Sequence, residues 1–210
     1  MSTDFFRYIS MSEARQYHHG DLRAAILERA TEVIEQDGIE ALSLRGIARD
    51  LGVSHAAPNR HFRTKADLLS SLARVGWEQI TEATLRAAED VRPNDSHHRL
   101  NAMGRGFLKW ALLNRSMFAA VTHPDVERHA DDDLKLAIDD FQRSVRDAVV
   151  ATQREGRLTH LDPAIATLYT NSVPFGLAMS LKNPLFGTDL SERDIDELVA
   201  NLIELVVPTS

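Results

Sequence analysis

Basic side chains gather in one short stretch of an otherwise acidic sequence. Between residues 41 and 66, five arginine or lysine residues accompany a single carboxylate, Asp50, so this stretch has a charge of +4. The whole chain of 210 residues carries −7, and residues 76–210, with 14 Lys/Arg and 21 Asp/Glu, alone sum to −7. A local positive patch is suited to binding nucleic-acid phosphates. The patch consists of Arg45, Arg49, Arg60, Arg63 and Lys65.

The same stretch predicts two short helices joined by a turn. Ser43 can cap the first helix by accepting a hydrogen bond from a backbone amide of its first turn. The apolar face of this helix has helical spacing and is formed by Leu44, Ile47, Ala48 and Leu51. Gly52 supplies the turn, and Ser54 can cap a second helix that we expect to continue to about His61. The result is a helix-turn-helix, and an ordinary helical hairpin within a core is the alternative.

The start of the second helix is suited to close contact with DNA bases. His55, Ala56 and Ala57 are small or polar. Small side chains let a helix lie against the base edges of a major groove, because the backbone can approach closely. This segment is therefore expected to read bases rather than to be buried.

A further helix is expected to begin just after this motif. Thr64 and Asp67 have the spacing of a capping box, in which each side chain satisfies a backbone amide of the other residue. The remaining free amides of the first turn, together with Lys65, can form a phosphate site. The apolar pattern continues toward Glu89, which predicts a long helix connecting two domains.

Composition and motifs exclude several classes of protein. Hydrophobic residues make up 43% of the chain, enough for a buried core, and no apolar run approaches the length of a membrane span. The chain has no cysteine and no recognisable leader, so a cytoplasmic protein is expected. No catalytic motif is present, and we expect neither enzymatic activity nor a cofactor. His18–His19 and the segment 129–133 are not expected to bind a metal, because consecutive side chains point apart.

Residues from about Tyr17 to Trp77 resemble the N-terminal DNA-binding domain of the TetR/AcrR family of bacterial transcriptional regulators. The segments that carry the resemblance are 24–30 (AAILERA) with Gly38, 42–48 (LSLRGIA), 51–54 (LGVS) and the pattern His61-Phe62-x-x-Lys65-x-x-Leu68. Two positions depart from the family pattern. Asn59 stands where the family usually has a phosphate-contacting tyrosine, and Pro58 replaces a commoner aliphatic residue. We expect Pro58 to bend the first turn of the second helix without breaking that helix.

The resemblance implies which residues contact double-stranded DNA. Arg45 is placed where its side chain reaches a base edge, and His61 and Lys65 are expected to contact the phosphate backbone. The full set of residues expected at the DNA is Arg45, Ser54, His55, Ala56, Ala57, Asn59, Arg60, His61, Thr64 and Lys65.

An all-α architecture is predicted for the whole chain. Residues 1–19 are expected to be a flexible arm and residues 20–66 a three-helix helix-turn-helix domain. Residues 67–210 are expected to be a ligand-sensing and dimerisation domain, with residues 67–90 as its connecting helix. Within it, helices are expected near 98–114, 116–123, 125–155 and 162–182, followed by a last helix capped by Ser191. Pro124 should end the second of these, and Pro174 should kink the fourth.

Two sets of apolar residues in the C-terminal part have candidate roles. A pocket for a small apolar effector is implied mainly by the resemblance, and core packing is the alternative for each residue. The candidates for the pocket are Met103, Phe107, Trp110, Phe118, Phe141, Tyr169, Phe175 and Met179. The last two helices are expected to form a four-helix bundle with a second copy of the chain. The candidates for this homodimer interface are Ile165, Leu168, Leu177, Leu198, Leu202 and Leu205.

The sequence therefore favours a ligand-responsive transcriptional regulator, in most family members a repressor, that a small apolar effector releases from a near-palindromic operator. The alternative is a degenerate family member that binds a ligand or a protein partner without sequence-specific DNA binding. Sequence alone does not distinguish a repressor from an activator.

Overall fold

A computed structural model of the chain describes residues 22–92, 95–182 and 192–206, and all regular structure within these ranges is helical. The all-α prediction is confirmed. The arm expected at residues 1–19, including His18 and His19, lies outside the described residues.

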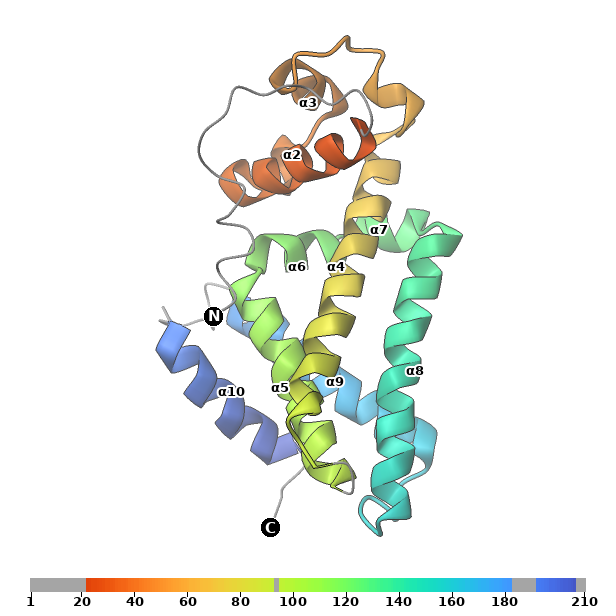
Figure 1. Cartoon of the computed structure of the whole chain (residues 1–210), viewed down its shortest axis with the longest axis vertical. Helices are drawn as coiled ribbons and strands as arrows, with labels where there is room; N and C mark the ends of the chain where they lie inside the picture. Colours follow the sequence, from red (N-terminus) through yellow and green to blue (C-terminus); the bar gives the residue numbers. More distant parts are fainter. Residues whose placement is uncertain (1–21, 93–94, 183–191, 207–210) are drawn as a thin grey trace.

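The N-terminal part, here called the head (residues 22–62), forms one end of the molecule (Figure 1). It consists of α2 (Leu22–Asp37), a 3₁₀ turn η1 (Ile39–Ala41), α3 (Leu44–Asp50) and a second 3₁₀ turn η2 (Pro58–Arg60). Gly38 ends α2 with φ of 81°, a backbone angle that favours glycine. The core of the head is apolar and includes Ile26, Ala30, Ile34, Leu42, Ile47 and Phe62.

Helix α4 (Lys65–Glu89) joins the head to the rest of the molecule (Figure 1). Its start is the predicted capping box: the hydroxyl of Thr64 accepts from the Asp67 amide at 3.1 Å, and the Asp67 carboxylate accepts from the Thr64 amide at 3.2 Å. The buried residues near its start include Leu68, Leu69 and Leu72, and those farther along include Ile80, Thr84 and Ala88.

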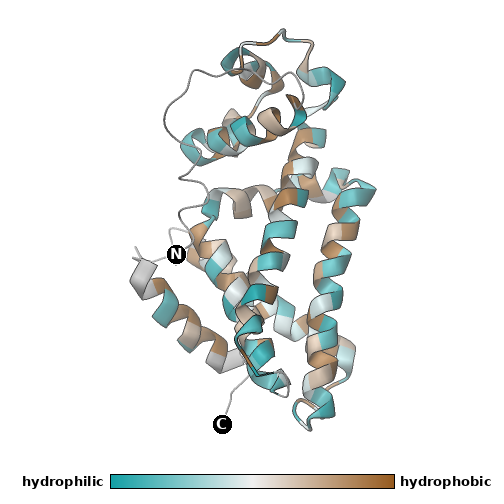
Figure 2. Ribbon diagram, in the orientation of Figure 1, coloured by the Kyte–Doolittle hydropathy of each residue, from teal (hydrophilic) through white to brown (hydrophobic). Residues whose placement is uncertain are grey.

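The C-terminal part, here called the body, packs around α5. Its helices are α5 (Ser96–Leu113), α6 (Arg115–Val121), α7 (Pro124–His129), α8 (Asp132–Arg154), α9 (Pro163–Lys182) and α10 (Glu192–Val206). Helix α5 contacts α4, α8, α9 and α10, whereas α6 also contacts α2 and η1 of the head. Polar and apolar residues alternate along α4 and α8 as expected of amphipathic helices (Figure 2).

Two boundaries in the body differ from the prediction. Pro124 begins α7 instead of only ending the preceding helix, because proline lacks the amide hydrogen that the first helical residue does not need. The single helix predicted over 125–155 is wrong: the chain is extended at Ala130 (φ −57°, ψ 118°), and Asp131 then caps α8 by accepting from the Leu134 amide at 2.8 Å. Helix α9 begins at Pro163 as predicted and remains helical through Pro174.

Helices α4 and α5 approach each other closely at Gly106. A Cβ atom at this position would lie 2.6 Å from the carbonyl oxygen of Ala83 and 2.8 Å from the Cβ of Ala87. Backbone atoms of α4 cannot move aside as a flexible side chain can. Gly106 is therefore needed for the short distance between these two helices.

We expect Gly106→Ala to lower the free energy of unfolding by about 1–3 kcal/mol, because the added methyl group forces α4 and α5 apart. Gly104→Ala on the same helix is the control. There the added atom meets only the end of the Ile203 side chain, at 3.3 Å, so the change should stay within about 1 kcal/mol. Urea denaturation measures both, and equal stability of the two variants would contradict the close-contact explanation.

Candidate functional site

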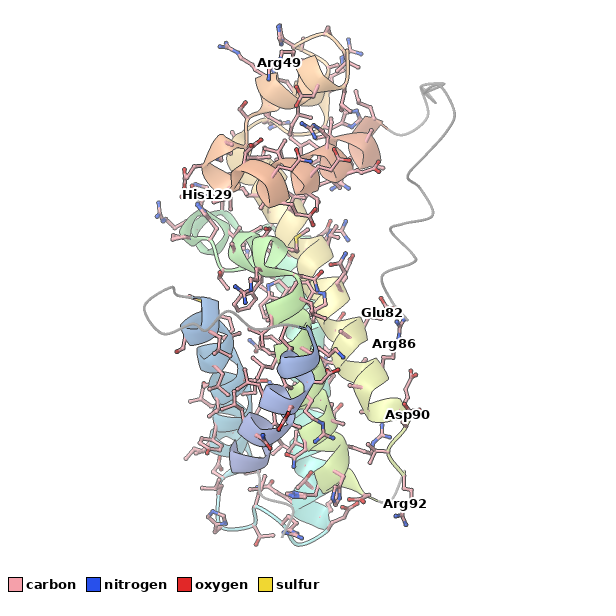
Figure 3. The ribbon with its side chains drawn as sticks, turned by 90° about the vertical axis from the view of Figure 1, so that its left-hand side faces the viewer. Arg49, Glu82, Arg86, Asp90, Arg92 and His129 are labelled. Carbon is pink, nitrogen blue, oxygen red and sulfur yellow. The ribbon has the colours of Figure 1, made fainter. Side chains whose placement is uncertain are left out.

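Exposed basic side chains lie on the head. Arg45 and Arg49 are exposed on α3, Arg60 is exposed on η2, and Arg63 is exposed just before α4. The side chain of Arg49 is 77% exposed and projects from the far end of the molecule (Figure 3). Four arginines of the sequence-derived patch are thus exposed on the head or directly after it.

The segment after Gly52 is a turn followed by η2, so the prediction of an α-helix from Ser54 to His61 is wrong. The Ala57 amide donates to the Ser54 carbonyl at 2.9 Å, and the Arg60 amide donates to the Ala57 carbonyl at 3.2 Å. Both bonds span three residues, as in a 3₁₀ turn. An α-helix capped by Ser54 needs a donor at residue 58 for the Ser54 carbonyl, and Pro58 has none.

The side chains of this segment remain accessible despite the changed backbone. Ser54, His55, Ala56, Asn59, Arg60 and His61 are exposed, whereas Ala57 is half-buried and Pro58 is buried. The proposed base-reading residues therefore lie on an irregular loop instead of a regular helix.

An ion pair joins α3 to α2. The Nε and Nη2 atoms of Arg29 donate to Asp50 Oδ2 at 3.1 and 2.9 Å, and Nη1 of Arg29 donates to Glu32 at 2.7 Å. The hydrogen bond from Arg29 lowers the pKa of Asp50, with a smaller contribution from Arg49. Since Arg45 and Arg49 lie on α3, this pair orients the helix that presents them.

Lys65, which is expected to contact phosphate, makes a hydrogen bond within the protein. Its Nζ atom donates to the Ile39 carbonyl at 3.1 Å, and the side chain is half-buried. This bond ties the start of α4 to η1. The exposed residue Thr64 is part of the cap, since its hydroxyl accepts from the Asp67 amide. An ammonium group has three donors, so a phosphate contact from Lys65 stays a prediction.

A cavity of about 270 Å³, partly open to solvent, lies between α4, α5, α8 and α9, with Ile203 of α10 in its wall. Four of the eight residues considered for a pocket line it: Met103, Phe107, Phe141 and Phe175. The structure places the other four elsewhere. Trp110 and Phe118 are buried in the core, and Tyr169 and Met179 are exposed on α9.

Sequence reasoning missed Trp77 and much of the polar lining of the cavity. Trp77 and Thr84 reach it from α4, Asn101 from α5, Gln142 from α8 and Asn171 from α9. A usable signal existed in α4, where Thr84 follows the buried Ile80 by one helical turn and so occupies the inward face. A polar residue at an inward position is the pattern that could have indicated the cavity.

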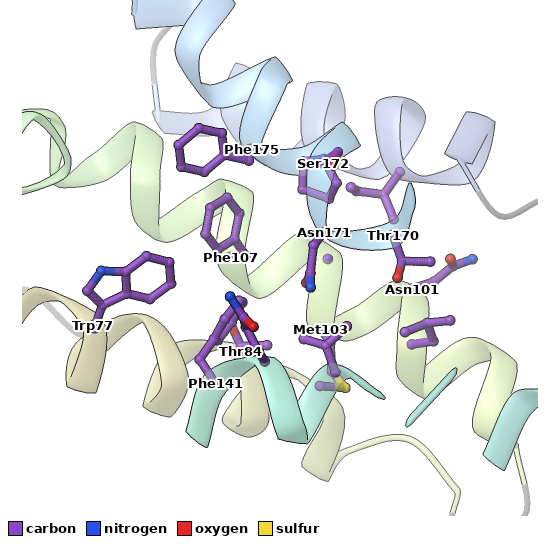
Figure 4. A pocket seen from close by; sticks show the side chains of 16 residues that line it. Trp77, Thr84, Asn101, Met103, Phe107, Phe141, Thr170, Asn171, Ser172 and Phe175 are labelled. Carbon is purple, nitrogen blue, oxygen red and sulfur yellow. The ribbon is translucent and has the colours of Figure 1, made fainter. Parts of the chain in front are cut away.

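The cavity has an aromatic end and a polar end. The Trp77 and Phe141 ring centroids are 5.3 Å apart, and those of Phe107 and Phe175 are 6.4 Å apart. Figure 4 shows Trp77, Phe107 and Phe175 toward one end and Asn101 and Thr170 toward the other. Such a mixed lining suits a molecule with a ring system and a hydrogen-bonding group.

An apolar surface runs along the outer face of α9. Ile165 is 58% exposed, Leu168 67% and Tyr169 45%. These residues and Met179 (41%) recur with helical spacing on one side of the helix. Of the other interface candidates, Leu177, Leu198 and Leu202 are half-buried, and the side chain of Leu205 lies outside the described residues. The inner face of α10 contributes Ile195, Val199 and Ile203 to the core of its own subunit.

Residues 26–72 match the family model described as bacterial regulatory proteins of the tetR family. The HTH-type transcriptional regulator Rv1816 of Mycobacterium tuberculosis is 28% identical over 98 residues, which are 47% of this chain and 42% of that protein. The match therefore spans less than half the length of this relative. None of the described helices is long and apolar enough to cross a membrane.

Solved structures extend the similarity over most of the chain. A protein of unknown function from Rhodococcus sp. RHA1 has 29% identity and a TM-score of 0.75, over 92% of this chain and 97% of that chain. AibR in complex with isovaleryl coenzyme A and operator DNA has a TM-score of 0.65 over 88% of this chain and 97% of that one. Its sequence identity is 18%, so this second likeness concerns the fold alone.

We expect Asp50→Asn to destabilise the protein at pH 7, because it removes the ionised partner of Arg29. The pKa of Asp50 is lowered in the folded state, so the stability that the pair contributes is present above the ordinary value of 3.8 and is lost as the pH falls through the lowered pKa. The difference in melting temperature from the wild type should thus shrink below pH 3.8. Calorimetry between pH 3 and 7 measures this. Asp37→Asn, at the exposed end of α2, is the control, and an identical pH dependence of both variants would exclude the ion pair as the cause.

Proposed function

This chain belongs to the TetR family of bacterial regulatory proteins, and from that premise we propose that it is a dimeric transcriptional regulator whose DNA binding is controlled by a small molecule in the body cavity. The observation that carries the proposal is the single helix α4. Its N-cap, Thr64, directly follows the basic head, and its residues Trp77 and Thr84 line the cavity.

The exposed arginines of the head support DNA binding. A guanidinium group presents several donors in a planar fork, which matches both phosphate oxygens and the edge of guanine. Arg45 lies in the first turn of α3, and the loop that includes His55 and Arg60 is exposed at the same end of the head. We assign base contact to Arg45 and backbone contact to His61 and Lys65.

The contacts of α4 provide the route from the cavity to the head. Leu68, Leu69 and Leu72 bury the start of α4 in the core, so a displacement of this helix moves the head with it. Helix α6 contacts both α4 and the head. A Cβ at Gly76 would overlap Val121 Cγ2, so α4 and α6 also lie close together. A shift of a few ångströms between two heads suffices to lose register with half-sites that lie roughly 34–36 Å apart.

AibR, a neighbour in fold, binds isovaleryl coenzyme A and operator DNA. This supports the combination of a ligand and an operator on such a fold. The coenzyme carries phosphate groups, which proteins usually bind with arginine, lysine or helix N-termini. The described residues that line the cavity of this chain include neither arginine nor lysine, so a different chemical class of effector is expected.

A second candidate function is a family member that binds a ligand without sequence-specific DNA binding. The observation in its favour is the turn at Pro58–Arg60, which replaces a regular recognition helix. Residue Asn59 also lacks the reach of a tyrosine. DNA-binding measurements separate this candidate from the first.

We expect the wild type to bind a DNA fragment from upstream of its own gene, and Arg45→Ala to weaken binding by about 1–3 kcal/mol per half-site, because a bidentate base contact is lost. The variant should also lose its base preference, but only at one symmetric pair of operator positions. Arg86→Ala is the control, since Arg86 is exposed in the last turn of α4, away from the head, and pairs with Glu82 (Figure 3). Fluorescence anisotropy measures binding. An equal effect of both variants would contradict the assignment of Arg45, and no binding by the wild type would favour the second candidate.

The exposed face of α9 supports a homodimer. A three-helix head reads only a few base pairs, so useful specificity requires two heads at a fixed separation. Apolar side chains as exposed as Ile165 and Leu168 mark a surface that a partner covers. A two-fold axis would bring α9 and α10 of both subunits together as a four-helix bundle.

We expect the wild type to be a dimer in solution and Leu168→Glu to be a monomer with much weaker operator binding, because a carboxylate cannot be buried in an apolar interface without a large cost. Leu136→Glu is the matched control: Leu136 is 57% exposed, on α8 instead of α9. Sedimentation velocity at micromolar concentration measures the mass. A monomeric wild type, or equal effects of both substitutions, would contradict the α9 interface.

A further inference from the structure

The hydroxyl group of Thr84 is unusual among the threonines of the described helices. Thr81, Thr152 and Thr167, for example, each donate a hydrogen bond to the carbonyl oxygen four residues earlier, at 2.8–2.9 Å. Thr84 makes no such bond, although it lies in the same helix as Thr81. Its Oγ1 atom has no hydrogen-bond partner within the described part of the protein, and the residue is 1% exposed.

A buried hydroxyl group without a partner is costly, because it loses its bonds to water on folding. A threonine within a helix can avoid this cost by donating a hydrogen bond to the backbone carbonyl oxygen four residues earlier. Thr84 instead lines the cavity, and Figure 4 shows it between the aromatic and polar ends. This geometry leaves a donor and an acceptor available to a bound molecule.

The rest of the polar lining is uncharged. Asn101, Gln142 and Asn171 supply amide groups, and none of the described residues that line the cavity is acidic or basic. Pro174, also in the wall, has no amide hydrogen for the Thr170 carbonyl, so the helical acceptor at Thr170 lacks its usual donor. An ionised ligand would lose its hydration here without gaining a counter-charge.

The volume limits the size of the ligand. A cavity of about 270 Å³ is slightly smaller than the roughly 300–1,000 Å³ that is usual for small-molecule sites. A molecule with one or two rings fits this space. Its rings would lie among Trp77, Phe107 and Phe175, whose faces favour offset or edge-on aromatic contacts.

We propose that the cavity binds an uncharged molecule of one or two rings, whose hydrogen-bonding group is held by the Thr84 hydroxyl and the amides of Asn101 and Asn171. Thr84 is then a specificity-determining residue for the polar group of the ligand, whereas the uncharged lining as a whole disfavours a carboxylate of the same shape. The inference rests on the proposed function, because the cavity is the effector site assigned there.

Matched pairs of compounds test the selection of charge. Isothermal titration calorimetry of the full chain without DNA, at pH 7, compares benzamide with benzoate, cinnamamide with cinnamate, and 2-naphthamide with 2-naphthoate. At least one amide should bind, and it should bind at least about tenfold more tightly than its carboxylate, since burying an unpaired charge costs more than one hydrogen bond returns. Equal or tighter binding of the carboxylates, or no binding by any of the amides, would overturn the proposal.

A pair of variants tests the role of Thr84. Thr84→Val keeps the shape of the side chain and should weaken binding of the best amide about 2- to 10-fold, the effect of one neutral hydrogen bond. Its melting temperature should be unchanged or slightly higher, because an unpartnered hydroxyl is removed. Thr81→Val is the control, since Thr81 already donates to the Trp77 carbonyl and does not line the cavity. Equal affinity of the two variants for the amide would exclude a hydrogen bond between Thr84 and the ligand.

The outcome is independent of DNA binding. If the amides bind selectively and the protein binds no DNA, the ligand class stands and the proposed regulatory function fails. If the protein binds its operator and the carboxylates bind as tightly as the amides, the regulatory function stands and the ligand class fails.

Discussion

The continuity of α4 is the constraint on which the rest of the structure depends. Twenty-five residues without a break make a rod of about 37 Å, which begins just after the head and passes beside the cavity. The capping box at Thr64 fixes where this rod starts, and the absence of a side chain at Gly76 and Gly106 lets α6 and α5 pack directly against it. The same helix contacts α2 of the head and supplies Trp77 and Thr84 to the cavity wall, so the head and the cavity share one rigid element.

The sequence predicted the helices whose signals are local. The cap at Thr64, the end of α2 at Gly38 and the start of α9 at Pro163 follow from single residues with strong conformational preferences, and the structure has all three. The failure at residues 54–61 is also local in origin. The resemblance favoured a helix there, but Pro58 lacks the donor that an α-helix requires, and the backbone adopts a 3₁₀ turn. At this position the conformational preference of Pro58 was a better guide to the backbone than the resemblance to the family.

The cavity could be predicted only in part, because apolar periodicity reports which face of a helix is inward and not what lies opposite it. Phe107 and Phe118 have equivalent signals in the sequence and are both buried, yet only Phe107 lines the cavity. Tyr169 and Met179 on α9 are apolar for another reason, since they lie on the exposed face that we assign to a second subunit. Whether the space between two helices is empty or filled by a side chain depends on contacts between residues far apart in the sequence, such as Gly106 and Ala83.

The central claim, that α4 transmits occupancy of the cavity to the head, is tested most directly by the distance between the two heads of a dimer. The chain has no cysteine, so Gln36→Cys on the exposed face of α2 gives one spin label per subunit. Double electron–electron resonance then compares the free protein with the protein saturated by the best aromatic amide. We expect the amide to shift the mean distance by a few ångströms, away from the value found on operator DNA. An unchanged distance at saturation would contradict the claim.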